Sequence, residues 1–495
     1  MKKILVANRG EIATRVMRTA REMGIATVAV YSEADRNMPF VRFADEAVCI
    51  GPAPSAQSYL RIDKILEAAR LTGADAIHPG YGFLSENAEF SQAVEDAGLT
   101  FIGPSAYSIN MMGNKISAKQ AAKKFDVPMV PGTDVPISDL DEAMKIAKEV
   151  GFPILIKAAA GGGGKGMRVV ESENEFESQM RLAQSEALSA FGNGDVFMER
   201  YVGSPKHIEI QVLGDKHGNY VYVFERECSI QRRHQKLIEE APSSCLTPDI
   251  RKQMGEAAVA AARACNYSGA GTVEFLVDEH LNFYFLEMNT RLQVEHCVTE
   301  MVSGLDLVRE QILVAMGQKL AFTQDDLKIN GHSIELRVCA EDPLNNFLPD
   351  TGKLLTYQPP KGPGVRVDDG YEEGMDIPIF YDPMIAKLVV HAATREQAIA
   401  RLCRAIDEYK INGIQTTLAF GKWAVQQDAF RKGDFDTKFI EKYYKPEYLS
   451  SLDEESSRIA ALFADTVWQK DAAASRKPLA AGASAVSKWK MRQRS

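Results

Sequence analysis

The sequence has 495 residues, of which 45% are hydrophobic and 25% charged, a composition that excludes a mostly disordered, collagen-like or disulfide-stapled chain. Lys and Arg total 58 against 67 for Asp and Glu, so the net charge of −9 argues against general nucleic-acid binding. The seven cysteines are scattered and odd in number, which predicts reduced thiols. With no signal-peptide pattern and no run of about 18 apolar residues, we expect no membrane span. The expected location is the cytoplasm, or an organelle matrix if a transit peptide was removed.

Residues 1–113 alternate between short apolar runs and amphipathic stretches. The runs at 3–7, 27–31, 46–50 and 75–78 predict strands, and the stretches 11–23 and 63–72 predict helices. Such alternation predicts a doubly wound parallel sheet, that is, an N-terminal Rossmann-like domain. Ligands of these sheets bind beyond the carboxyl ends of the strands, where this sequence has residues 8–11 and 78–82.

Three further regions follow along the chain. Residues 114–330 mix strands with helices near 115–125 and 140–150, and they carry two glycine-rich or charged loops. Residues 331–446 are strand-rich and close with a helix at 395–409, which predicts a mixed β/α domain. Residues 447–495 form an extension whose last part, 470–495, is basic and poor in apolar residues. We expect a flexible tail there, with partner docking as the alternative.

Residues 161–166 read GGGGKG and match the pattern G-x-G-x-x-G. Strand-like residues flank this run at 153–157 and 167–170, so neither a dinucleotide-binding helix nor a P-loop follows. The glycines predict a flap that covers phosphates through backbone N–H groups, and a plain flexible hairpin is the alternative. Lys157 ends the first strand, where a buried lysine is unfavourable unless it meets an anion.

Residues 273–277 and 283–287 predict a β-hairpin. If its loop is 279–282, Glu274 lies opposite Glu287 on the same face. Two adjacent carboxylates repel unless a cation joins them, and an oxygen-rich pair suits Mg²⁺ or Mn²⁺. An edge strand with a polar face is the alternative.

Polar residues continue at every second position after Glu287, namely at Asn289, Arg291, Gln293 and Glu295. In an extended chain these side chains would share one face over about 26 Å, since each residue adds ~3.3 Å. We therefore expect a metal at the Glu287 end and a second substrate at the Glu295 end.

Three other segments carry signals that leave two readings open. Residues 199–202 follow an apolar strand and either pair with the edge of a nucleotide base or are a plain strand end. Residues 231–236 form a dense basic loop that faces an anion or solvent. His207 lies in a strand, where a structural histidine is commoner than a functional one.

These segments, in this order, resemble the biotin carboxylase component of biotin-dependent carboxylases. The resemblance rests on residues 4–13 (ILVANRGEIA), 78–87 (HPGYGFLSEN), 112–115 (MGNK), the glycine flap, 231–236 (QRRHQK), 287–296 (EMNTRLQVEH), Arg337 before 340–343 (AEDP), and 381–388 (YDPMIAKL). It covers residues 1 to about 445. It implies a central ATP-grasp domain with a mobile lid that closes over ATP.

The resemblance also implies roles for individual residues. It assigns Lys115, Lys157, His207, Gln231 and His234 to ATP, Gly163 and Gly164 to the phosphate flap, and Glu199, Arg200 and Val202 to the adenine; Arg200 stands where the family often has lysine. It assigns Mg²⁺ or Mn²⁺ to Glu274, Glu287 and Asn289, and bicarbonate to Lys236, Arg291, Gln293 and Val294. Glu295 would take the proton of bicarbonate, and Arg337 would stabilise the enolate of biotin.

The implied reaction is the ATP-dependent carboxylation of biotin by bicarbonate through carboxyphosphate, the first half-reaction of an acyl-CoA or pyruvate carboxylase. Lys145 lies in an Ala-Met-Lys sequence, but within a predicted helix. We therefore expect biotin on a separate carrier protein, a carboxyltransferase on another subunit, and a homodimer of this chain. The alternatives are an ATP-grasp ligase that joins a carboxylate to an amine, and an inactive nucleotide-binding regulatory subunit.

Overall fold

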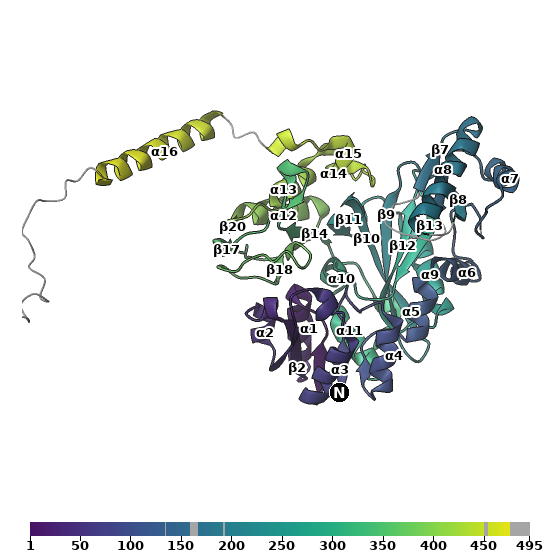
Figure 1. Cartoon of the computed structure of the whole chain (residues 1–495), viewed down its shortest axis with the longest axis horizontal. Helices are drawn as coiled ribbons and strands as arrows, with labels where there is room; N and C mark the ends of the chain where they lie inside the picture. The colour runs from purple at the N-terminus through teal and green to yellow at the C-terminus, as the bar shows by residue number, and fades with distance from the viewer. Residues whose placement is uncertain (134, 159–166, 192–193, 450–453, 476–495) are drawn as a thin grey trace, which may run out of the picture. The chain divides into compact units, whose positions relative to one another are not determined.

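The computed structural model describes the chain except for residues 134, 159–166, 192–193, 450–453 and 476–495 (Figure 1). The chain divides into two compact units, Met1–Tyr444 and Lys445–Ser495. Within the described ranges, no helix combines the length and the apolar character needed to cross a membrane. All seven cysteines are free thiols, as predicted.

A five-stranded parallel sheet forms the N-terminal part of the first unit, as the alternating pattern predicted. Its strand order is β3-β2-β1-β4-β5, so the order reverses between β1 and β4. At this switch point Asn8 Nδ2 donates to the carbonyl oxygens of Pro79 and Tyr81, both at 2.7 Å, so the two predicted ligand loops lie side by side. The strands are β1 (Lys3–Val6), β2 (Ala26–Ser32), β3 (Glu46–Gly51), β4 (Ala76–His78) and β5 (Thr100–Phe101), and the helices are α1 (Gly10–Glu22), α2 (Pro39–Phe43), α3 (Ile62–Thr72), α4 (Ala88–Asp96) and α5 (Ala106–Gly113).

An eight-stranded antiparallel sheet runs through the rest of this unit in the order β13-β12-β9-β10-β11-β14-β19-β18. The strands are β9 (Lys206–Gly214), β10 (Tyr220–Arg232), β11 (Gln235–Ala241), β12 (Gly269–Val277), β13 (Phe283–Asn289), β14 (His332–Cys339), β18 (Val365–Asp369) and β19 (Met384–Ala392). Because β11 pairs with β14, the sheet continues across the predicted boundary at residue 330.

Helices of this unit pack against the large sheet and around its edges. Among them α9 contacts β9 and β10, α10 contacts β10 and β14, and α12 contacts β14 and β19. The helices are α9 (Pro248–Ala264), α10 (His296–Ser303), α11 (Leu307–Ala315), α12 (Arg395–Glu408), α13 (Leu418–Gln426), α14 (Asp428–Lys432) and α15 (Phe439–Tyr443). Two short ribbons complete the region: β15 (Glu341–Asp342) with β16 (Leu348–Pro349), and β17 (Thr356–Gln358) with β20 (Lys410–Asn412).

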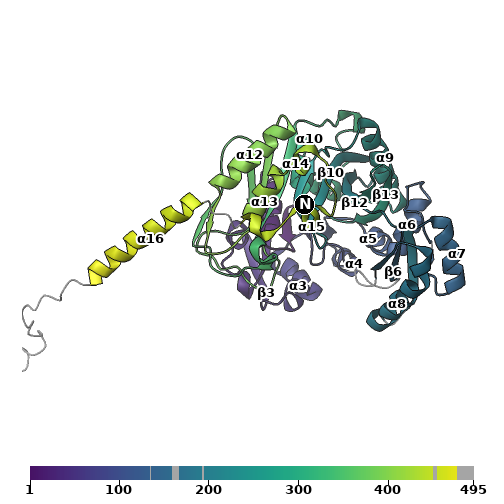
Figure 2. The same cartoon turned by 90° about the horizontal axis from the view of Figure 1, so that it is seen from above.

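A small sheet in the order β7-β6-β8 has its own apolar core with two helices, and both views draw it at the margin of the first unit (Figures 1 and 2). Its elements are β6 (Ile154–Ala158), β7 (Met167–Val170), β8 (Val196–Arg200), α7 (Leu140–Val150) and α8 (Glu173–Phe191), and α6 (Lys115–Lys123) precedes them. Strands β6 and β7 are the two predicted to flank the glycine run. Gly163 and Gly164 lie outside the described residues.

The second unit contains one long helix, α16 (Glu454–Ser475), which the composition of the extension did not predict. Residues 470–475 belong to this helix, which corrects the predicted start of the flexible tail. The remainder of the predicted tail lies outside the described residues.

The hairpin of β12 and β13 pairs Glu274 with Glu287, as predicted, although by another route. On β12 the pairing begins one residue farther from the loop than expected, because Val277 and not Asp278 lies opposite Phe283. A bulge at Leu286, between the pairs Phe275–Phe285 and Glu274–Glu287, then shifts the register by one residue. Without this bulge the two carboxylates would not be paired.

We expect Gly271→Ala in β12 to lower the free energy of unfolding by about 1–3 kcal/mol, the usual effect of overpacking a core. A Cβ at this position would lie 2.6 Å from Cε1 of the fully buried Tyr267 ring. The measurement is denaturant unfolding, and Gly113→Ala is the control, since a Cβ there meets nothing within 4 Å. Equal stability of the two variants would contradict this packing.

Candidate active site

Lys236 on β11 brings three buried carboxylates together. Its ammonium Nζ donates to Glu209, to Glu274 at 2.8 Å and to Glu295 at 2.7 Å. Glu209 lies on β9 and Glu274 on β12, so strands that are not neighbours of β11 contribute to one site. Burial alone would lower the pKa of Lys236, but the surrounding carboxylates raise it well above its usual value. The lysine is therefore held as a cation.

Glu274 accepts hydrogen bonds from four side chains. Its Oε1 accepts from Lys236 at 2.8 Å, from Asn289 Nδ2 at 3.0 Å and from Gln293 Nε2 at 2.8 Å, while Oε2 lies 2.9 Å from Nε2 of His207. Burial raises the pKa of Glu274, yet Lys236 and His207 lower it more, so the net pKa is well below its usual value. A fully ionised carboxylate thus lies at the centre of the predicted metal and ATP residues.

Arg337 on β14 joins Glu295 to a further buried carboxylate. Its Nε donates to Glu239 Oε1 at 2.6 Å and its NH2 group to Glu295 Oε2 at 2.9 Å. Burial raises the pKa of Glu295, but Lys236 and Arg337 together lower it below its usual value. Two residues predicted to act on different substrates, Glu295 and Arg337, are therefore in direct contact.

The prediction of one extended polar face from Glu287 to Glu295 is wrong. Strand β13 ends at Asn289, and the chain turns, so that Glu295 has φ −78° and ψ 9° and immediately precedes α10. The turn brings Glu295 to the same ammonium group that binds Glu274. The two ends of the motif share one site because a helix begins where a strand was expected to continue.

Arg291 faces the N-terminal domain. Its Nε lies 2.8 Å from Glu86 Oε2, and its NH2 group donates to Asn289 Oδ1 at 3.1 Å. Glu86 also accepts from the backbone N–H of Thr290 at 3.0 Å. The sequence motif at 78–87 thus supports the turn that follows β13.

The residues predicted to contact ATP divide into two groups. His207 and Gln231 join the Lys236 site, since Gln231 Nε2 lies 3.1 Å from His207 Nδ1. Although burial lowers the pKa of His207, Glu274 raises it above its usual value. His234 is exposed in the turn between β10 and β11 with φ 67°, and Lys115 begins α6, with its side chain outside the described set.

The small sheet carries the second group. Glu199 on β8 accepts hydrogen bonds from Lys157 on β6 and from Lys119 on α6. Arg200 contacts the hydroxyl of Tyr284 at 2.6 Å, and its backbone N–H donates to the carbonyl oxygen of Pro131. These partners differ from those of Lys236, so the predicted adenine segment and the Lys236 site are two separate groups of contacts.

Sequence reasoning missed several residues that hold this site. Arg226 is fully buried on β10 and contacts Glu209 and, at 3.0 Å, Gln293 Oε1. Lys387 on β19 is equally buried, and its Nζ donates to the carbonyl oxygen of Val294 at 2.9 Å. The signal for Glu209 was present, because polar residues alternate along β9 at 207, 209 and 211.

Glu287 differs from its partner across the hairpin. Its side chain is exposed, whereas Glu274 is buried, and the two residues lie directly opposite each other on β13 and β12. With Asn289 Oδ1 they offer only oxygen ligands, the donor set that Mg²⁺ and Mn²⁺ prefer. The residues present therefore fit a divalent ion that is reached from solvent on the Glu287 side.

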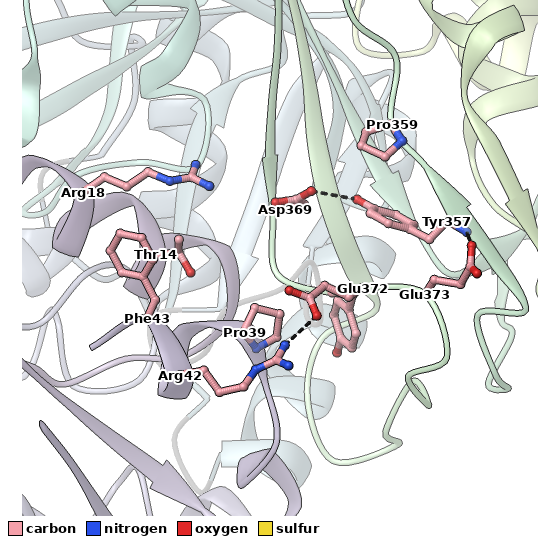
Figure 3. Close-up of a pocket in the computed structure, with 11 residues that line it drawn as sticks. Thr14, Arg18, Pro39, Arg42, Phe43, Tyr357, Pro359, Asp369, Glu372 and Glu373 are labelled. Carbon is pink, nitrogen blue, oxygen red and sulfur yellow. Dashed lines mark hydrogen bonds and ion pairs between the residues drawn. The ribbon is translucent and has the colours of Figure 1, made fainter. Parts of the chain in front are cut away.

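A cavity of about 650 Å³ lies between α1, α2 and the C-terminal strands (Figure 3). Along its walls, the guanidinium of Arg42 donates a hydrogen bond to Glu372 Oε2 at 2.5 Å, and the hydroxyl of Tyr357 donates one to Asp369 Oδ2 at 3.4 Å. The lining residues are Thr14, Arg18, Pro39, Arg42, Phe43, Tyr357, Pro359, Asp369, Tyr371, Glu372 and Glu373. This lining includes none of the predicted site residues, so the candidate site is the Lys236 site and not this cavity.

We expect Lys236→Met to lower the free energy of unfolding at neutral pH by about 3–5 kcal/mol, because it leaves buried carboxylates without their cation. The pKa values of Glu274 and Glu295 are lowered in the folded chain, so this stabilisation is present above about pH 4.5 and is lost as the pH falls. Denaturant unfolding at pH 7 and pH 4 measures the difference. Lys252→Met is the control, since Lys252 makes only an exposed contact of 3.8 Å with Glu256. A loss that does not depend on pH would contradict the charge argument.

Three family models match the chain. They are described as the biotin carboxylase N-terminal domain over residues 1–109, the carbamoyl-phosphate synthase L chain ATP-binding domain over 114–323, and the biotin carboxylase C-terminal domain over 335–442. Among curated relatives, a pyruvate carboxylase subunit of Methanothermobacter thermautotrophicus is 56% identical over 89% of this chain and 90% of its own length. Biotin carboxylase 1 of Bacillus subtilis is 52% identical over 90% of this chain and 99% of its own length.

Solved structures give the same result. Biotin carboxylase from Campylobacter jejuni, in a complex with β,γ-ATP, has a TM-score of 0.84 and 50% identity, and the match covers 89% of this chain and 99% of that one. The biotin carboxylase domain of a thermophilic 2-oxoglutarate carboxylase, bound to bicarbonate, has a TM-score of 0.87 and 45% identity, with 91% and 99% covered. Both agree with the predicted N-terminal parallel sheet, central ATP-grasp domain and C-terminal mixed domain. The chain belongs to the biotin carboxylase family, the ATP-grasp ligases that carboxylate biotin with ATP and bicarbonate.

Proposed function

We propose that the Lys236 site is where this chain deprotonates bicarbonate and carboxylates biotin. The observation that supports the proposal is the continuous contact of a lysine, a carboxylate and a guanidinium, namely Lys236, Glu295 and Arg337. A cation beside a carboxylate can bind an anion while the carboxylate accepts its proton. A related domain is bicarbonate-bound in its solved structure, which agrees with this assignment.

Bicarbonate would enter between the cations of this site. Lys236 and Arg291, with Gln293 and the backbone N–H of Val294, would hold the anion. In the present structure Lys236 holds three carboxylates, so an incoming anion takes over part of that hydrogen bonding. Glu295 then loses part of the positive surroundings that lower its pKa and becomes a better base.

ATP would bind between the small sheet and the Lys236 site. Lys115, Lys157, His207, Gln231 and His234 would contact it, Gly163 and Gly164 would cover the phosphates, and Glu199, Arg200 and Val202 would face the adenine. Lys157 now bonds Glu199, and a phosphate competes for the same ammonium group. A related biotin carboxylase was solved as a complex with β,γ-ATP, which supports this half of the proposal.

Glu274, Glu287 and Asn289 would hold Mg²⁺, or Mn²⁺, which neutralises phosphate charge during phosphoryl transfer. Glu274 has to exchange hydrogen bonds for this, because its oxygens accept from Lys236, Asn289, Gln293 and His207. Glu287 lies opposite Glu274 on the neighbouring strand and is exposed, so a hydrated ion would reach the site from the side of Glu287.

Arg337 would stabilise the enolate that forms when the ring nitrogen of biotin loses its proton. Bicarbonate attacks the γ-phosphate and displaces ADP to give carboxyphosphate, which breaks down to CO₂ and phosphate. Phosphate accepts the proton from the biotin nitrogen, which then adds to CO₂. The guanidinium bears a full positive charge, because Glu239 and Glu295 raise its pKa although burial lowers it. A fixed cation next to a developing oxyanion is the usual electrostatic means of stabilising it.

The remaining assignments concern partners and boundaries. We propose that biotin is carried by a separate carrier protein, that a carboxyltransferase subunit completes the reaction, and that the chain forms a homodimer in the cytoplasm. The biotin carboxylase domain of a related 2-oxoglutarate carboxylase was solved as a dimer, which agrees with the proposed homodimer.

Lys145 is exposed on α7, in the predicted helix, and is proposed to carry no biotin. The proposed domains are residues 1–113, 114–330 and 331–446, followed by the extension 447–495.

We expect Glu287→Gln to raise the Mg²⁺ concentration needed for half-maximal turnover by on the order of tenfold or more, as losses in a metal's coordination shell do. The measurement is a Mg²⁺ titration of ADP release in the presence of bicarbonate. Glu279→Gln, an exposed change in the loop of the same hairpin, is the control and should titrate like the wild type. An unchanged Mg²⁺ requirement in folded Glu287→Gln protein would remove Glu287 from the proposed ligands.

We expect Glu295→Gln to lower bicarbonate-dependent turnover by about 10²-fold or more while ATP still binds, since the amide keeps the shape and cannot accept the proton. ADP release and nucleotide binding are measured on the same preparation. The control is Glu310→Gln on α11, a partly buried carboxylate outside the site. Near-normal turnover of Glu295→Gln would move the role of base to another group.

The function itself is tested by ADP release from the purified chain with ATP, Mg²⁺ and bicarbonate, with and without free biotin. We expect slow release that requires bicarbonate and becomes faster with biotin, which becomes carboxylated. Arg337→Ala should abolish biotin carboxylation and keep some bicarbonate-dependent ATP cleavage, because the enolate forms after carboxyphosphate. An amine-ligating enzyme would not respond to biotin, and a regulatory subunit would show no turnover; either result would reject the proposal.

A further inference from the structure

Strand β11 has a bulge next to the active-site lysine. Gln231 of β10 pairs with Lys236, but the preceding Ile230 pairs with Ile238, so Leu237 is an extra residue in β11. In a regular strand, residues 236 and 239 would point to opposite faces. The bulge turns Lys236 and Glu239 to the same face of the sheet, and bulges next to active sites commonly redirect side chains in this way.

Among the described residues, the hydrogen bond that connects Glu239 to the reaction site is the one with Arg337. Its Oε1 accepts from Nε of Arg337 at 2.6 Å, and its side chain is completely buried. Burial raises the pKa of Glu239 to about 7, against the opposing effect of Arg337. The guanidinium of Arg337 therefore has two carboxylate partners. One is Glu239 on the neighbouring strand, and the other is Glu295, the proposed base for bicarbonate.

A matched neighbour shows that a buried glutamate in this sheet does not have to contact Arg337. Glu335 on β14 lies directly opposite Glu239 and is equally buried. Neither oxygen of Glu335 has a hydrogen-bond partner among the described residues, and burial raises its pKa well above the usual value. Glu335 is thus surrounded much as Glu239 is, without the contact that Glu239 makes.

We propose that Glu239 is a positioning residue for the carboxylation of biotin: it anchors Nε of Arg337, so that the outer NH groups stay directed at the reacting centre. This inference rests on the proposed function. When Glu295 turns to bicarbonate, Arg337 loses one of its two carboxylate partners. Glu239 then becomes the group that keeps a long, flexible side chain in place, and the guanidinium is present when CO₂ and biotin meet.

The experiment measures carboxybiotin formed per ADP released, a ratio that does not depend on the fraction of folded enzyme. In Glu239→Ala we expect this ratio to fall by about 10- to 100-fold, the range for a lost charge-assisted hydrogen bond, while ADP release without biotin changes far less. Glu239→Gln keeps an acceptor for Nε of Arg337 and should stay within about 3-fold of the wild-type ratio. Glu335→Gln is the control and should have the wild-type ratio.

Three results would overturn the proposal. The first is a wild-type ratio in Glu239→Ala, and the second is an equal fall in Glu335→Gln, which would mean that removing any buried glutamate charge of this sheet has the same effect. A ratio in Glu239→Gln as low as in Glu239→Ala would also reject the anchoring hydrogen bond. Failure of the proposed function looks different, because the wild-type chain would then form no carboxybiotin at all.

Discussion

The site depends on buried charges that neutralise one another, because any one of these groups would be strongly destabilising if it were buried without its partners. Lys236 contacts three carboxylates, and Arg226 and Arg337 each contact one of the same three. Breaking a buried pair costs on the order of 3–5 kcal/mol, so each group constrains the others. The same arrangement suits the proposed chemistry, because an entering anion can replace a carboxylate at a cation without leaving that cation unpaired.

The segment that carries most of the chemistry is held from two sides. Glu86 of the N-terminal domain binds both the backbone of Thr290 and the side chain of Arg291. From the C-terminal strands, Lys387 binds the carbonyl oxygen of Val294 and lies 3.4 Å from Glu11. Sequence motifs almost 400 positions apart therefore meet at one turn, which explains why the motifs of this chain are short blocks separated by ordinary sequence.

Local pattern was enough to predict strands β1 to β4 with helices α1 and α3 of the N-terminal sheet, and the strands around the glycine run, but not β5, α2, α4 or α5. It also predicted the pairing of Glu274 with Glu287, although in a register that the structure reaches only through a bulge. It failed where a bulge or a turn changes the direction of side chains. The bulge at Leu286 and the turn before Glu295 each interrupt the alternation of side chains, and the periodicity of the sequence does not record either interruption. Glu209 was missed although polar residues alternate along β9, because its partner Lys236 lies on a strand that is not its neighbour.

The pairing of β11 with β14 connects two parts of the proposed site, whereas the small sheet contains neither strand. Four successive residue pairs, from Ile238–Leu336 to Ala241–Ser333, join these strands, so a backbone ladder holds the strand of Lys236 beside the strand of Arg337. The small sheet with Lys157 and Glu199 shares no strand with the large one. It does contact the large sheet, because Arg200 on β8 bonds the hydroxyl of Tyr284 on β13 at 2.6 Å, so a change in the position of the small sheet would act on the strand that also carries Glu287.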